Sequence, residues 1–170
     1  MKKTGFTLIE ILVTVGILGM IAVIGSGMFF SILRGSTKTK TLQLVKQNGD
    51  YAISVMERMI RNAKSVNGGG SSIAIVNPDG KTTTFNCCGS GSNLMIASQS
   101  GTLSCEEARL TSSEVKVDIC SFEVTSGEPG VRPAVVKINF TLSQAPPAGG
   151  ARPEEQASIN FQTTVSLRNY

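Results

Sequence analysis

Met1–Gly5 (MKKTG) is followed by Phe6–Leu33 (FTLIEILVTVGILGMIAVIGSGMFFSIL), and these two segments are the strongest indication of the fold. The first segment is a short basic head. The second is a run of 28 residues in which Glu10 carries the single charge. A run of that length and apolarity predicts a membrane-spanning helix. A carboxylate inside such a helix costs about 2.5–3.5 kcal/mol on insertion scales, so we expect Glu10 to have a partner and a function.

The motif GFTLIE at Gly5–Glu10, directly after a short basic leader, resembles the N-terminus of type IV pilins and of the pseudopilins of type II secretion systems. The resemblance covers roughly Met1–Ile32, and beyond that only the layout of the chain is similar to the family. It implies an α+β, pilin-like fold. A long N-terminal α-helix, membrane-embedded in its first half and amphipathic in its second, would pack on an antiparallel β-sheet head.

The same resemblance implies a processing and assembly route. A prepilin peptidase would cleave between Gly5 and Phe6, Phe6 would be N-methylated, and Glu10 would pair with the Phe6 amine of a neighbouring subunit. Pairing relieves the cost of two lone buried charges and fixes the axial register of the two helices. The implied partners are other pilins or pseudopilins in a homo- or hetero-oligomeric filament, the peptidase, an assembly ATPase and an inner-membrane platform protein.

The implied location is the cytoplasmic membrane, crossed once with the N-terminus in the cytoplasm and the head outside, followed by an extracellular or periplasmic filament. Charge alone does not orient the chain, because Lys2 and Lys3 precede the apolar run while Arg34, Lys38 and Lys40 follow it. The long expected strands of the head and the segment Met56–Ala63 resemble minor pilins and minor pseudopilins more than major ones. Retention of Glu10 argues against the tip pseudopilin type that lacks this acid.

Two other interpretations of the N-terminal segment remain open. A secretory signal peptide would have an apolar core of only about 7–15 residues and a small-residue cleavage site. A plain single-pass anchor of an exported protein accounts for the length of the run but not for Glu10. Glu10 would then be an acid that extends toward the membrane edge.

The helical pattern continues beyond Leu33. A stripe of small and apolar residues predicts an amphipathic helix, and Asn67–Gly70 (NGGG) predicts its end. The expected domains are therefore a leader at 1–5, a transmembrane or filament-core helix at 6–33, an amphipathic continuation at 34–67 and a β-rich head at 68–170. Coiled-coil pairing is the alternative use of the stripe, which consists of Leu42, Val45, Gly49, Ala52, Met56, Met59, Ala63 and Val66.

After Gly70 the apolar period changes to two, which predicts strands. The turn signal Asn77–Gly80 (NPDG) predicts a hairpin between its flanking strands. The last three strands are the longest and predict an antiparallel meander packed on the helix. The expected strands are Ser72–Val76, Lys81–Asn86, Asn93–Ser98, Glu114–Thr125, Ala134–Ser143 and Ser158–Leu167, with a helical turn at Glu106–Leu110.

Four cysteines lie in the C-terminal half, and outside the cytoplasm they are expected to form disulfides. A bridge between the neighbours Cys87 and Cys88 would be strained. Two pairings therefore remain, in which Cys87 and Cys88 reach Cys105 and Cys120 in either order. A zinc site and buried free thiols are the alternatives, although the usual C-x2–4-C knuckles are missing.

The sequence contains no histidine, which excludes Ser-His-Asp catalysis, Cys-His catalysis and His-ligated metal sites. No nucleophile–base pair, phosphate-binding loop or carboxylate cluster indicates an enzyme, a cofactor or a bound metal, so a membrane-tethered exported enzyme is disfavoured. Glu106 and Glu107 are interpreted as a solvated loop edge.

Nucleic acid is not a favoured partner. The net charge of +4 falls to +2 once Lys2 and Lys3 are removed with the leader. A competence-type pilin that binds DNA for uptake is the alternative binding function. Arg132, Lys137 and Arg152 are its candidate contacts, because DNA capture depends on clustered Lys and Arg side chains.

Overall fold

The computed structural model describes Gly5 and residues 7–128, 130–145 and 157–168. The chain divides into two compact units, Met1–Thr39 and Lys40–Tyr170. One helix, α1 (Leu8–Asn62), runs through both units without a break. It is long and apolar enough near the N-terminus to cross a membrane, judged by length and composition. The second unit adds two antiparallel sheets, so the α+β, pilin-like fold class is confirmed.

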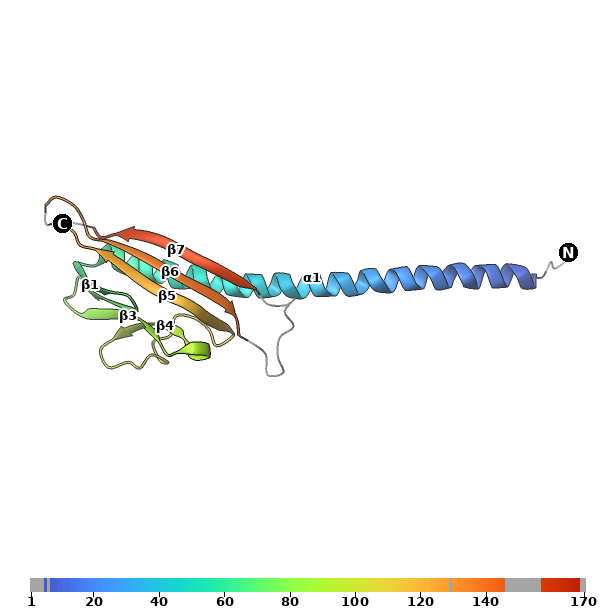
Figure 1. Ribbon diagram of the computed structural model, residues 1–170, viewed down its shortest axis with the longest axis horizontal. Helices are drawn as coiled ribbons and strands as arrows, with labels where there is room; N and C mark the ends of the chain where they lie inside the picture. Colours follow the sequence, from blue (N-terminus) through green and yellow to red (C-terminus); the bar gives the residue numbers. More distant parts are fainter. Residues whose placement is uncertain (1–4, 6, 129, 146–156, 169–170) are drawn as a thin grey trace. The chain divides into compact units, whose positions relative to one another are not determined.

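The first sheet, sheet A, has the strand order β1-β2-β3-β4, with a short 3-10 helix η1 (Gly91–Asn93) before its last strand. The second, sheet B, is the expected three-stranded meander in the order β5-β6-β7, whose strands run side by side along the second half of α1 (Figure 1). The strands are β1 (Ser65–Gly69), β2 (Ser72–Val76), β3 (Thr82–Cys88), β4 (Met95–Ser100), β5 (Val115–Thr125), β6 (Val135–Gln144) and β7 (Ser158–Ser166).

The buried side of α1 within the second unit is the small and apolar stripe expected from the sequence. Val45, Gly49, Ala52 and Met56 are all buried, whereas Leu42 is exposed. Sheet B contributes Phe140, Phe161 and Val165 to the same core, and sheet A contributes Ile73, Ile75, Phe85 and Ile96. The stripe therefore packs on the sheets of its own head rather than forming a coiled coil.

The helix ends earlier than the sequence pattern indicated, and the expected boundary at residue 67 is wrong. Helix α1 stops at Asn62, and the next residues turn into β1, where the Lys64 amide donates to the Val76 carbonyl at 2.8 Å. Val66 and its neighbours are poor helix formers, while pairing with β2 satisfies their backbone groups. Gly68 and Gly69 therefore pair with β2 as the end of β1, Gly70 begins the turn of the β1–β2 hairpin, and these glycines do not cap the helix.

The predicted NPDG hairpin joins β2 and β3. The Gly80 amide donates to the Asn77 carbonyl at 3.0 Å, and Gly80 adopts φ +83°, a left-handed conformation that favours glycine. The strands that flank the turn match the expected ones closely, but β3 extends to Cys88. The expected helical turn near Glu106 is a single turn, closed by the Ala108 amide on the Ser104 carbonyl at 3.0 Å.

The apolar residues of β5 alternate up to Ile119 in the sequence and resume at Phe122, which predicts an irregularity between these two residues. In the structure the irregularity lies nearer the start of β5. The register against β6 shifts between Val117 and Ile119, as in a β-bulge. Because of this shift, Ile119 faces outward and is exposed, although its apolar side chain fitted an inward position. Phe122 is buried in the core beyond the bulge.

Two disulfides cross-link the second unit. Cys87 pairs with Cys120 and so joins β3 of sheet A to β5 of sheet B, while Cys88 pairs with Cys105. The structure thus selects one of the two pairings that the sequence left open, and none of the four thiols remains for zinc. A backbone bridge between Gly70 and Phe122, with hydrogen bonds of 2.8 and 2.7 Å, reinforces the same junction.

Candidate assembly and processing site

The residues that the motif singled out lie just before α1 and in its first turn. Gly5 is exposed, and a β-carbon placed on it would have no atom within 4 Å. Phe6, the expected cleavage and methylation residue, lies outside the described residues. Glu10 is exposed on the first turn of α1, three residues after the helix-capping position.

Thr7 is the residue that sequence reasoning missed here. Its carbonyl accepts the Ile11 amide at 3.3 Å and the Glu10 amide at 3.1 Å, and its hydroxyl Oγ1 lies 3.4 Å from the Glu10 amide nitrogen. Thr7 is thus the N-cap of α1, and Glu10 occupies the third helical position. The pattern Thr-x-x-Glu is that of a capping box, a sequence signal that could have located the helix start.

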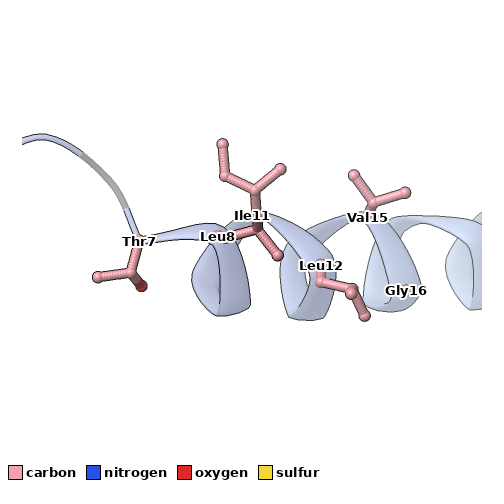
Figure 2. Close-up of a pocket in the computed structure, with 6 residues that line it drawn as sticks. All are labelled: Thr7, Leu8, Ile11, Leu12, Val15 and Gly16. Atoms are coloured by element: carbon pink, nitrogen blue, oxygen red, sulfur yellow. The ribbon is translucent and has the colours of Figure 1, made fainter.

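The helix beyond this turn presents a continuous apolar surface. Leu8, Ile11, Leu12 and Val15 are between 54% and 83% exposed, so these large side chains contact little within the first unit. Together with Thr7 and Gly16 they line a shallow apolar groove, and Figure 2 shows their side chains extending outward from the helix. Exposed apolar surface on this scale marks a membrane or helix-packing surface.

Glycines interrupt this surface without breaking the helix. Gly16, Gly19, Gly25 and Gly27 lie within α1, and a β-carbon on any of them would meet nothing within 4 Å in this chain. Each costs about 1 kcal/mol relative to alanine in a helix. Small residues let helices approach closely, so their presence favours contact with another helix.

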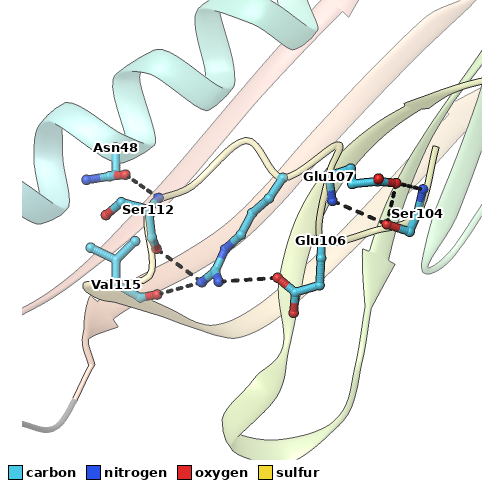
Figure 3. A network of polar contacts seen from close by, with 7 residues as sticks. Asn48, Ser104, Glu106, Glu107, Ser112 and Val115 are labelled. Atoms are coloured by element: carbon cyan, nitrogen blue, oxygen red, sulfur yellow. Dashed lines mark hydrogen bonds and ion pairs between the residues drawn. The ribbon is translucent and has the colours of Figure 1, made fainter.

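Glu106 and Glu107, the expected acidic loop edge, each interact with a residue three positions away in the chain. Figure 3 shows Glu107 bonded to Ser104, with its Oε2 accepting from the backbone amide at 2.9 Å and from the hydroxyl at 2.7 Å. These bonds lower the pKa of the exposed Glu107 carboxyl, the backbone bond contributing most. Glu106 lies 4.0 Å from the Arg109 guanidinium.

The same loop is bonded to the helix. The Asn48 side-chain carbonyl of α1 accepts the Ser112 amide at 2.8 Å, and Arg109 Nη2 donates to the carbonyls of Ser112 and Val115 (Figure 3). These hydrogen bonds hold the loop against α1 and the start of β5, which is a structural role. Among the residues the structure describes, no group of three or more Cys, Asp or Glu could hold a metal ion.

Two of the three candidate DNA contacts, Arg132 and Lys137, each pair with a different carboxylate. Arg132 pairs with Glu128 at 3.0 Å in the β5–β6 loop, and Lys137 pairs with Glu123 at 3.6 Å on the outer side of sheet B. Arg152 lies outside the described residues. The basic residues that do lie near Arg132 are Lys64 and Arg168, which sequence reasoning did not select because they are distant along the chain.

Comparison with known proteins gives one match. The family model for the prokaryotic N-terminal methylation motif matches residues 1–26, which include Gly5, the N-cap Thr7, Glu10 and the start of the exposed apolar helix. No curated protein and no solved structure matches the chain. Residues 1–26 therefore identify the chain as a carrier of the N-terminal signature of type IV pilins and pseudopilins.

Proposed function

We propose that the protein is a structural subunit of a type IV pilus or of a type II secretion pseudopilus. The methylation motif at residues 1–26, followed by an apolar helix whose large side chains are exposed, is the observation that carries this proposal. A pilin-like subunit needs such a helix twice, first as a membrane anchor and then as the part buried in the filament core.

Processing by a prepilin peptidase would cleave the bond between Gly5 and Phe6. Glycine has no side chain to obstruct the peptidase, and the space around Gly5 is open. Cleavage creates a new amine on Phe6, which would then be N-methylated and remain cationic near neutral pH. The N-terminus would lie in the cytoplasm before cleavage, with the head on the other side of the membrane.

Assembly would pair Glu10 of one subunit with the Phe6 amine of its neighbour. A lone carboxylate in an apolar filament core costs several kcal/mol, and an opposite charge at hydrogen-bond distance offsets much of that cost. Glu10 lies in the first turn of α1 and is exposed, so its carboxylate is available to a second chain. An assembly ATPase and an inner-membrane platform protein would be the separate machinery that moves subunits into the filament.

The test is the intact mass and N-terminal residue of the protein from its own cells or co-expressed with a prepilin peptidase. We expect a chain that begins at N-methylated Phe6, and an uncleaved chain in a variant with Gly5→Leu. The matched control is Gly35→Leu, an equally open glycine of α1 outside the motif, which should be processed normally. An uncleaved native chain, or a cut near Ser26, would refute the proposal.

A further inference from the structure

A cleft of about 440 Å³ lies in the second unit. Three segments that are far apart in the sequence form its walls: the turn from α1 into β1, the β5–β6 loop and the residues after β7. Each segment brings one cation to the lining, namely Lys64, Arg132 and Arg168. We call it the basic cleft.

The basic cleft has a positive charge excess. Among its described lining residues the three cations face one carboxylate, Glu128, which already pairs with Arg132. Neither Lys64 nor Arg168 forms an ion pair with another described residue. The lining therefore carries a net charge of about +2, supplied by donors with no acceptor of their own.

Main-chain hydrogen bonds fix the walls in place. The Arg168 amide donates to the Arg61 carbonyl and the Leu167 amide to the Ala134 carbonyl, each at 3.0 Å. Glu128 and Arg132 exchange both backbone bonds, at 2.9 and 3.0 Å. The cleft is thus preorganised, which reduces the entropy lost when a ligand binds.

The two arms of the β5–β6 loop pack closely at Gly127, because a β-carbon there would overlap the backbone nitrogen of Ala134. The remaining polar lining comes from Ser65, Asn67 and Ser126, whose side chains offer further hydrogen bonds. Such a mixture of cations and neutral donors suits an oxyanion.

We propose that the basic cleft binds a phosphate group that carries two negative charges. A phosphate monoester or free phosphate near neutral pH carries about −1.5 to −2 and so matches the net charge of the lining. Arg offers a planar fork and Lys a point charge, and both are common phosphate ligands. A carboxylate would leave half of the excess charge unmatched. This inference goes beyond filament assembly and does not depend on it.

The competing explanation is that these cations only complement the C-terminal end of α1, where backbone carbonyls carry a partial negative charge. In that case Lys64 and Arg168 would affect the stability of the head without binding any anion. The two explanations make different predictions for the removal of the Glu128 charge. If the cleft binds phosphate, the Glu128 carboxylate repels the ligand and its removal should raise the affinity. If the cations only neutralise the helix end, its removal should not produce phosphate binding.

The experiment is a titration of the full chain with inorganic phosphate in a non-ionic maltoside detergent. Binding is monitored through the NMR chemical shifts of the backbone amides of Lys64 and Arg168. We expect saturable binding that weakens as salt is added. The double variant Lys64→Gln and Arg168→Gln should lose at least about tenfold in affinity. Glu128→Gln should bind phosphate about two- to fivefold more tightly, a gain that misfolding cannot mimic.

Lys137→Gln is the matched control, because it removes a cation of sheet B that lies outside the basic cleft and should leave the affinity unchanged. If a 5′-phosphorylated oligonucleotide binds more tightly than its unphosphorylated form, the cleft recognises a terminal phosphate monoester. Equal binding of both oligonucleotides without binding of inorganic phosphate would overturn the proposal in favour of a nucleic-acid backbone. Absence of phosphate binding, or equal affinity in all variants, would overturn it in favour of helix-end neutralisation.

Discussion

Gly49 of α1 lies directly beneath the aromatic ring of Phe161 in β7, so that a β-carbon at position 49 would overlap the ring. Phe161 in turn stacks on Phe140 of β6, with ring centroids 5.2 Å apart and an interplanar angle of 19°. The absence of one side chain on the helix thus lets sheet B approach α1 and seats an aromatic pair in the core.

Replacing Gly49 with alanine should therefore destabilise the head. Alanine gains about 1 kcal/mol in helix propensity, but overpacking beneath an aromatic ring costs about 1–3 kcal/mol, and the backbone of α1 has little room to move. The net loss should appear as a lower denaturant midpoint of the full chain in detergent. Gly35→Ala, at an open position of the same helix, should show the propensity gain alone. Equal effects of the two substitutions would contradict the close packing.

The disulfide that joins the two sheets should matter more for the stability of the head than the second one. Cys87–Cys120 closes a span of 33 residues and Cys88–Cys105 a span of 17. From the loop-closure entropy of the unfolded chain, the first disulfide should stabilise the folded state by about 4 kcal/mol and the second by about 3 kcal/mol. The paired variant Cys87→Ser and Cys120→Ser should unfold at a lower denaturant concentration than Cys88→Ser and Cys105→Ser. The reverse order would show that the link between the sheets is not what stabilises the head.

Glu10→Gln should abolish filament assembly while leaving cleavage unchanged. The substitution keeps the size of the side chain but removes the charge that would offset a neighbouring Phe6 amine in the filament core. Processing is read from the intact mass, and assembly from the yield of sheared filaments, which should fall at least about tenfold. Asp50→Asn removes an exposed acid from the same helix and serves as the control. Normal filaments in the Glu10 variant would refute the pairing.

The Ser104–Glu107 contact predicts a local pH dependence. Because the folded-state pKa of Glu107 is lowered below its ordinary value of 4.5, the contact stabilises the loop above that pH. The contribution disappears as the pH falls through the lowered pKa. Ser104→Ala removes the hydroxyl bond but keeps the backbone bond, so the pKa should rise part of the way back.

A carbon-detected NMR titration of the Glu107 carboxyl measures that pKa directly. Ser121→Ala, a change at an exposed serine of β5, is expected to leave the titration curve in place. A Glu107 pKa that is the same with and without the Ser104 hydroxyl would show that the side-chain bond does not form in solution.

Sequence alone located most of the strands because the apolar pattern and the turn residues agreed. The NPDG turn and the last three strands have strong local signals, and the observed ladders follow them. The C-terminus of the helix was misplaced because Ala63 and Val66 continue the small and apolar stripe of the helix. Pairing with β2, a contact made only in the folded chain, selects the strand.

The candidate site shows the same division. Gly5, Phe6 and Glu10 were recognisable as a motif, and the Thr-x-x-Glu pattern is a local signal for the capping role of Thr7 that the hydrogen bonds at the start of α1 confirm. Lys64 and Arg168 could not be connected with Arg132 from the sequence, because more than thirty residues separate each from it. Only folding brings the three cations to one cleft.

Local sequence patterns were enough to predict the apolar helix, the N-terminal signature and the meander, because each depends on residues that are near neighbours along the chain. Tertiary structure decided which cysteines pair, where α1 ends, which side Ile119 faces and which cations share a cleft. These features depend on contacts between residues that are distant in sequence, and packing in a single compact core selects among the alternatives that local patterns leave equal.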